Sequence, residues 1–124
     1  MTLLWVMVAG GAGCGARYLV GVWAAERLGP AFPYGTLIVN LTGCFALGVV
    51  AHAASTMSWN PELRAPIAAG FLGGFTTYSS FNHDTLALFA GGSTGAAVLN
   101  VVITLAGGWL AGWLGLVVAR QLVA

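Results

Sequence analysis

Residues 70–81 read Gly70-Phe71-Leu72-Gly73-Gly74-Phe75-Thr76-Thr77-Tyr78-Ser79-Ser80-Phe81. This run lies inside a long apolar segment, yet its glycines, paired threonines and paired serines are unusual for a continuous membrane helix. A glycine in a helix interior costs about 1 kcal/mol relative to alanine, and threonine side chains can hydrogen-bond backbone that has left the helix. We therefore expect a helix that stops near Gly73, crosses an irregular turn and restarts near Thr77. Broken helices at membrane depth often hold ions, because freed carbonyls and helix N-termini point into the gap.

The composition is that of an integral membrane protein. Hydrophobic residues make up 59% of the 124 residues and charged residues only 6%, whereas a soluble domain carries roughly 25% charged residues. At about 20 residues per span, the length allows one all-α membrane domain, residues 1–124, with four transmembrane helices. We expect spans at residues 3–24, 34–54, 62–89 and 96–118, the third broken at its centre. The net charge of +1 gives no reason to expect a nucleic-acid partner.

The arginines are evenly divided between the two ends of the expected spans. Four spans would place both termini and the second loop on one face, together with Arg64 and Arg120. The opposite face would carry Arg27 in the first loop, with Arg17 near that end of the first span. Orientation follows the excess of basic residues on one side, and here neither side has an excess. The chain is therefore expected to insert in both orientations, which allows an antiparallel homodimer in the lipid bilayer.

Three glycine pairs have the four-residue spacing that lets membrane helices approach closely. They are Gly11 and Gly15, Gly70 and Gly74, and Gly108 and Gly112. The last two pairs leave two possibilities open, contact within one chain and contact across a dimer.

Two polar stripes run along the expected spans. Thr36, Asn40 and Gly43 share one helical face in the second span, and the Asn40 amide needs hydrogen-bond partners in an apolar setting. Its role is open between interhelical hydrogen bonding and a donor that lines a pore. Asn100 and Thr104 form a similar stripe in the fourth span, for which interhelical packing is one interpretation.

Tyr78 and Phe81 are three residues apart, and so lie on one face of the restarted helix. Ser79 and Ser80 lie between them. Ring edges carry partial positive charge, so two ring edges, an amide and hydroxyls together can stabilise a small anion. A full positive charge at the same place would bind the anion too tightly to release it. Arg17, the one cation expected within a span, is either functional or extends to the membrane interface.

No enzyme chemistry is visible in the sequence. His83 and Asp84 are adjacent, but neither they nor the two cysteines have further metal ligands at workable spacing. No nucleophile is paired with a general base. We therefore do not expect an enzyme.

Residues 70–81 closely resemble the signature of the small bacterial fluoride channels, the Fluc or CrcB family. Residues 13–18, Gly-Cys-Gly-Ala-Arg-Tyr, look like the glycine-rich end of that family's first span. Residues 33–43, Pro-Tyr-Gly-Thr-Leu-Ile-Val-Asn-Leu-Thr-Gly, look like the start of its second. The four-span layout extends the resemblance to essentially the whole chain.

The resemblance implies a passive fluoride-selective channel in the inner or plasma membrane of a prokaryote. It implies an antiparallel, dual-topology homodimer with two pores, through which fluoride leaves the cytoplasm. A paired homologue as heterodimer partner is a second possibility. The resemblance also implies a structural sodium ion at the centre, held by the backbone carbonyls of Gly73 and Thr76 from both subunits.

The resemblance assigns the pore residues as well. Asn40 corresponds to the pore asparagine, Tyr78 and Phe81 to the pore aromatics, Ser79, Ser80 and Thr104 to a track of hydroxyls, and Arg17 to a vestibule arginine. The sequence departs from the family in two places, at Tyr78, where phenylalanine is usual, and at Asn100, where an aromatic is common.

Two other classes of protein are weighed against the channel. A proton-coupled four-span exporter of cationic drugs would be expected to have a carboxylate within a span, whereas the first acidic residue here is Glu26, in a loop. A non-transporting membrane scaffold would use the glycines for packing. It gives no reason for the clustered threonines, serines and aromatics of residues 76–81.

Overall fold

The computed structural model of the chain describes residues 1–123, and all regular secondary structure in that part is helical. Three long helices are α1 (Thr2–Leu28), α2 (Tyr34–Thr56) and α6 (Thr94–Leu122). Between α2 and α6 lie α3 (Pro61–Ala65), the π-helical segment η1 (Pro66–Leu72), α4 (Gly73–Phe75) and α5 (Tyr78–Ala90). The expectation of an all-α fold is confirmed.

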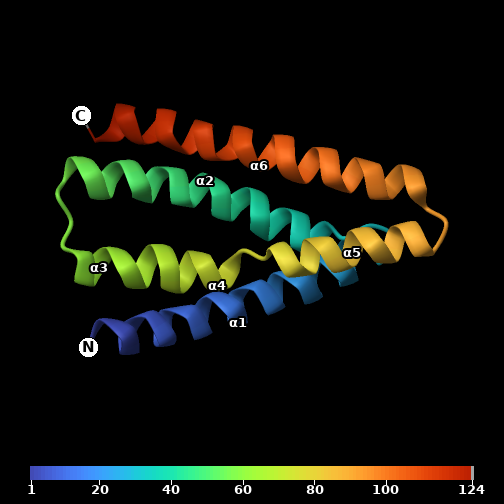
Figure 1. The fold of residues 1–124 in the computed structure, drawn as a ribbon, viewed down its shortest axis with the longest axis horizontal. Coiled ribbons are helices and arrows are strands. Elements are labelled where there is room, and N and C mark those ends of the chain that lie inside the picture. The colour runs from blue at the N-terminus through green and yellow to red at the C-terminus, as the bar shows by residue number, and fades with distance from the viewer. Residues whose placement is uncertain (124) are drawn as a thin grey trace.

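Three helices within residues 1–123 are long and apolar enough to cross a membrane. They are α1, α2 and α6, with mean hydropathies of 1.4, 1.8 and 2.0. Each extends beyond the residues expected from the sequence for its span. The fourth run, residues 61–90, lies alongside them but is divided among shorter helices (Figure 1).

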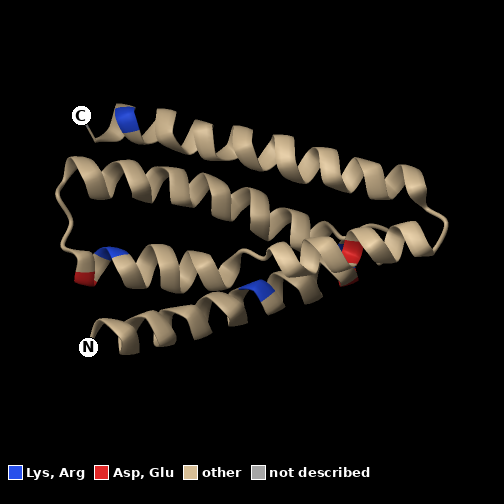
Figure 2. Cartoon of the chain, viewed as in Figure 1, with Lys and Arg blue, Asp and Glu red and all other residues tan. Residues whose placement is uncertain are grey.

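The runs lie side by side, and successive runs point in opposite directions (Figure 1). The N-terminus, the C-terminus and the connection from α2 to α3 all lie at one end of the molecule. Figure 2 shows basic residues at that end, on α3 and on the last turns of α6. A chain that crosses a membrane an even number of times has this arrangement.

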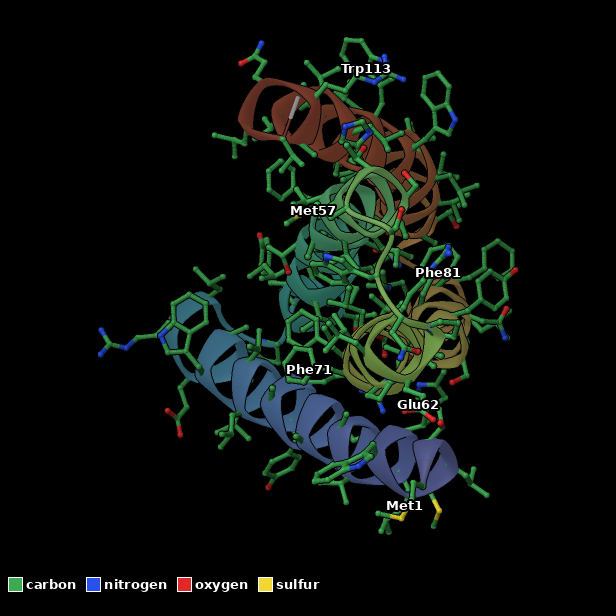
Figure 3. All side chains as sticks on the ribbon, turned by 90° about the vertical axis from the view of Figure 1, so that its left-hand side faces the viewer. Met1, Met57, Glu62, Phe71, Phe81 and Trp113 are labelled. Carbon is green, nitrogen blue, oxygen red and sulfur yellow. The ribbon has the colours of Figure 1, made fainter. Side chains whose placement is uncertain are left out.

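The helices form an open arrangement around α2. The most extensive contact is between α2 and α6, while α1 packs on η1, α4 and α2. Viewed from that end, α1 and α6 lie on opposite sides of α2, and the Trp113 side chain projects outward from α6 (Figure 3). Large apolar side chains are exposed along the long helices, among them Trp109 at 79%. Exposed apolar surface of this extent faces lipid or another protein.

Two of the three glycine pairs make contacts within the chain. Gly74 of α4 faces Gly10 of α1 so closely that a Cβ at position 74 would lie 2.5 Å from the Gly10 carbonyl oxygen. Gly108 and Gly112 of α6 face Cys44 of α2. Both pairs therefore make contacts within one chain.

The first pair, Gly11 and Gly15, makes no close contact in the chain, although it has the same four-residue spacing. Nothing lies within 4 Å of a Cβ placed at Gly11 or Gly15. The face of α1 that meets η1 and α4 instead carries Gly10 and Gly13, and a Cβ at Gly13 would overlap the Phe71 carbonyl. Positions 10 and 13 are three apart and share a face, whereas Gly11 is rotated away from it.

The backbone leaves the helix at Thr76 and Thr77. Gly73 has helical dihedrals, φ −65° and ψ −36°, so the helix continues past the glycine at which we expected it to stop. Thr76 (φ −85°, ψ 157°) and Thr77 (φ −153°, ψ 119°) are extended. Helical structure resumes at Tyr78. Gly70 and Gly74 therefore serve close packing on α1, and the irregular backbone falls on the threonines that follow.

Candidate functional site

The Asn40 side chain on α2 holds the extended segment in place. Its Nδ2 donates to the Thr77 carbonyl at 2.9 Å, and its Oδ1 accepts from the Thr77 N–H at 2.7 Å. Thr77 is buried, at 8% exposed, and its N–H is outside the helix, so without Asn40 this donor would lack a partner at an energetic cost. Asn40 therefore makes interhelical hydrogen bonds. An amide nitrogen has two donor hydrogens, so a second donor of Asn40 can serve another partner.

Thr76 packs on the same helix. A Cβ added at Gly43 of α2 would overlap the Thr76 methyl group, Cγ2. The Thr76 hydroxyl donates to the Leu72 carbonyl at 2.9 Å. Asn40 and Gly43 thus present one face of α2 to both extended residues.

Hydroxyl groups gather where α5 begins. The Thr77 Oγ1 caps the helix by accepting from the Ser80 N–H at 3.1 Å. It also lies 3.1 Å from the Ser80 Oγ and 3.3 Å from the Ser79 Oγ. These hydroxyls surround a helix N-terminus, where the positive end of the helix dipole favours an anion.

The two aromatic rings of α5 are in contact. The centroids of Tyr78 and Phe81 are 5.7 Å apart and their planes are inclined by 62°, an edge-on arrangement. Tyr78 is 76% exposed, whereas Phe81 is buried at 6%. The pair therefore extends from the interior of the chain to its surface.

Arg17 shares a cavity with part of this cluster. The cavity, of about 280 Å³, lies between α1, the start of α2 and the start of α5, and its lining includes Arg17, Thr77 and Ser80. The Arg17 Nη2 is 3.6 Å from the Cys14 Sγ. The structure thus brings the arginine to the hydroxyls at the start of α5. Tyr78, Phe81 and Thr104 are not among the residues that line this cavity.

Thr104 belongs to a separate network between α5 and α6. Its Oγ1 donates to the Asn100 Oδ1 at 3.5 Å, and the Asn100 Nδ2 donates to the Thr85 Oγ1 at 2.9 Å. No pattern in the sequence singles out Thr85. The signal that could have found it is the turn at residues 91–93, because residues at similar distances on either side of a helical hairpin turn face each other.

A second hydrogen bond between α2 and α5 was also missed. The Thr36 Oγ1 donates to the Asp84 Oδ2 at 2.7 Å, and the His83 Nδ1 lies 3.6 Å from the Asp84 Oδ1. Asp84 contributes to a cavity of about 440 Å³ under the connection from α1 to α2. Thr36 lies one turn before Asn40, so one face of α2 bonds both the extended segment and α5. The shared face of Thr36 and Asn40 was evident from the spacing, but their partners were not.

The main-chain oxygens of Gly73 and Thr76 suit a hard cation. In a continuous helix they would accept from the N–H groups of Thr77 and Ser80. Here the Thr77 N–H donates to Asn40 and the Ser80 N–H donates to the Thr77 hydroxyl. Both carbonyls are thereby left for other partners, and carbonyl oxygen is a ligand type suited to hard cations. Within residues 1–123, no group of three or more His, Cys, Asp or Glu side chains could hold a metal ion.

Comparison with known proteins gives full-length matches. The family described as "CrcB-like protein, Camphor Resistance (CrcB)" matches residues 4–116. A protein of Acidobacterium capsulatum named fluoride-specific ion channel FluC is 46% identical over 125 residues, covering 100% of both chains. The protein of that name from Sorangium cellulosum is 48% identical, covering 97% of this chain and 95% of its own. That from Geobacter sulfurreducens is 43% identical, covering 98% of each. These relatives are named as ion channels, not as enzymes.

Proposed function

This chain belongs to the CrcB-like protein family, and we propose on that basis that it forms a fluoride-selective channel through which fluoride leaves the cytoplasm passively. The observation that carries the proposal is the cluster at the start of α5. There Asn40 holds two extended residues, and hydroxyls and two contacting rings adjoin a helix N-terminus. The full-length relatives named as fluoride-specific channels supply the identity of the ion.

The chemistry of the cluster suits a small, strongly hydrated anion. Removing the water of fluoride in an apolar passage would be prohibitive. The ring edges of Tyr78 and Phe81, the second amide hydrogen of Asn40 and the hydroxyls of Ser79 and Ser80 would replace that water a few bonds at a time. Several weak sites in series let the ion move on.

Two further residues, Arg17 and Thr104, are proposed to act along the same fluoride path. Arg17, beside the cavity that Thr77 and Ser80 help to line, would raise the local concentration of anions at the mouth. Thr104 would extend the track of hydroxyls along α6.

The channel is proposed to be an antiparallel homodimer with two pores, in the inner or plasma membrane of a prokaryote. Support comes from the exposure of Tyr78, which is 76% in the single chain. A residue on the outer surface of one protomer can line an ion path only if a second surface encloses it. A paired homologue could supply that surface in a heterodimer.

A structural sodium ion is proposed at the centre of the dimer. The carbonyls of Gly73 and Thr76 from both subunits would hold it, because the N–H groups that would normally bond them are engaged elsewhere. Such an ion, when bound, supplies positive charge that stabilises the approach of helix-end carbonyls from two protomers.

Fluoride release from liposomes tests the proposed function. Vesicles loaded with potassium fluoride and containing the purified chain are expected to release fluoride to an electrode once a potassium ionophore relieves the charge imbalance. Vesicles without protein should retain it, and matched protein-containing vesicles loaded with potassium chloride should retain their chloride. A proton-coupled drug exporter would instead need a cationic substrate and a pH gradient, and a scaffold would release nothing. Failure of the parent chain to release fluoride contradicts the proposal.

A further inference from the structure

Asn100 is the most deeply buried polar side chain of the described residues. It lies on α6 and is 1% exposed. Among the described residues, Val39 and Asn100 are the largest side chains that are fully buried. An amide in the interior of a membrane helix bundle is costly unless its groups are hydrogen-bonded. The identity of its partners therefore decides what Asn100 does.

The stronger bond of Asn100 leads to the aromatic pair. Its Nδ2 donates to the Thr85 Oγ1 at 2.9 Å, and the Thr85 Oγ1 donates to the Phe81 carbonyl at 2.7 Å. The bond from Thr104 to the Asn100 Oδ1 is 3.5 Å, at the outer limit for a hydrogen bond. Hydrogen bonds in such a chain polarise and strengthen one another. A continuous path of two short bonds therefore joins α6 to the main chain of Phe81.

The helix that carries the rings needs support of this kind. Since Thr76 and Thr77 are extended, α5 is not a rigid continuation of α4. At its start it is held by the bonds of Asn40 from α2 to Thr77. At its second turn it is held by the bond of Thr36 from α2 to Asp84 and, from the other side, by the bond of Asn100 from α6 to Thr85. Asn100 is the one of these side chains that holds α5 from α6, one turn after Phe81.

We propose that Asn100 is a positioning residue for ion passage, which acts through Thr85 to fix the orientation of α5 and the places of the Tyr78 and Phe81 rings. The inference rests on the proposed fluoride channel, in which those rings line the path. It assigns Asn100 no contact with the ion. The hydrogen bond to Thr85 is the contact through which the asparagine acts.

Two substitutions remove the bond from opposite sides. Asn100→Leu keeps the branch at Cγ and loses the donor, while Thr85→Val keeps the shape and loses the hydroxyl. Thr85→Ser keeps the hydroxyl and should behave as the parent does. Val102→Leu, at an exposed position on α6, is the matched control for a change of side chain on that helix.

Single-channel fluoride current in planar bilayers is the first measurement, because a change that affects only folding alters the number of channels and leaves the current of each unchanged. Asn100→Leu and Thr85→Val should each lower that current about fivefold. This factor corresponds to the net free energy that one hydrogen bond contributes. The double variant should be no worse than the worse single one, because both changes break the same bond. The proposal is overturned if the Asn100→Leu channel carries the same current as the parent. It is also overturned if Asn100→Leu lowers the current while Thr85→Val leaves it unchanged.

A second measurement is independent of conduction. With 4-fluorophenylalanine in place of Phe81 in the purified full chain, the ¹⁹F signal should shift or broaden in Asn100→Leu and Thr85→Val, but not in Val102→Leu. An unchanged signal in both variants overturns the proposal. If the parent passes no fluoride, the proposed function fails and the ¹⁹F signal alone decides the role of Asn100. If Asn100→Leu does not fold, Thr85→Val decides by both measurements.

Discussion

Asn40 and the main chain of Thr77 exchange two hydrogen bonds, of 2.9 and 2.7 Å, although the residues lie on separate helical runs. The bond to the Thr77 N–H takes the donor that would otherwise continue the helix to the Gly73 carbonyl. One side chain on α2 therefore accounts both for the extended backbone at Thr77 and for a helix-end carbonyl left without its usual partner.

Asn40→Asp should abolish fluoride release. The substitution replaces the Nδ2 donor with an oxygen that faces the Thr77 carbonyl, and an ionised carboxylate would also repel an anion in the path. Loss of one hydrogen bond with an unsatisfied buried acceptor should lower the free energy of unfolding by about 1–3 kcal/mol. Liposome release and thermal unfolding in detergent measure the two effects. The control is Thr42→Val on the same helix, because the Thr42 hydroxyl bonds only carbonyls of its own helix. An Asn40→Asp variant that releases fluoride at the parent rate removes Asn40 from the path.

Phe81→Ile should greatly reduce fluoride release while the protein still folds. The substitution keeps much of the buried volume but removes the ring edge, and with it the positive rim proposed to face the ion. Tyr78→Phe serves as the matched change. Because Tyr78 is 76% exposed, loss of its hydroxyl should alter the free energy of unfolding by less than about 0.5 kcal/mol, and release should continue. If only Tyr78→Phe loses release, the hydroxyl itself coordinates the ion and ring edges do not.

Much of the fold follows from patterns within short stretches of sequence. The hydropathy of residues 3–24, 34–54 and 96–118 identified the three long helices, because membrane helices must satisfy their own backbone and face lipid with apolar side chains. The turns fell where glycine and proline gather, between α1 and α2 and between α5 and α6. The glycines and threonines of residues 70–81 indicated irregular backbone in the right run.

The placement of that irregular backbone depended on contacts distant in sequence. The glycines suggested a helix that stops near Gly73. The residues that contact the extended backbone lie on α2, where Asn40 bonds Thr77 and Gly43 packs against Thr76. The bonds from Thr36 to Asp84 and from Asn100 to Thr85 join separate runs in the same way. A single sequence reveals which polar side chains need a partner and does not reveal which partner each one meets.

Both orientations of the chain are expected in the membrane. The termini lie at the same end of the molecule (Figure 1), and the sequence predicts no excess of arginine on either side of the membrane. Reporter domains fused to the C-terminus should therefore be active on both sides of the membrane. Two or three lysines added near the termini should force one orientation. A reporter active on one side only, together with a monomer by cross-linking, contradicts the proposed antiparallel dimer.

Gly73→Leu should separate the stability of the protomer from that of the dimer. Gly73 is exposed in the single chain and has helical dihedrals, and the one atom near an added Cβ is the Ala68 carbonyl oxygen at 3.7 Å. The protomer should therefore keep its helical content. If the Gly73 carbonyls of two protomers approach a shared sodium ion, a leucine there would crowd the contact and cost about 1–3 kcal/mol of association free energy. Helical content by circular dichroism and dimer fraction by cross-linking in detergent measure the two effects.

The sodium ion is tested in the same preparation. The thermal stability of the parent dimer should rise in sodium chloride relative to choline chloride of equal ionic strength, since a ligand that binds only the assembled state stabilises it. Gly73→Leu should lose this dependence. Thr76→Ser should keep it, because the main-chain carbonyl and the hydroxyl bond to Leu72 both remain. A Gly73→Leu variant that dimerises and responds to sodium as the parent does would place the subunit contact and the ion away from Gly73. The diverted N–H groups of Thr77 and Ser80 would then serve only to shape the start of α5.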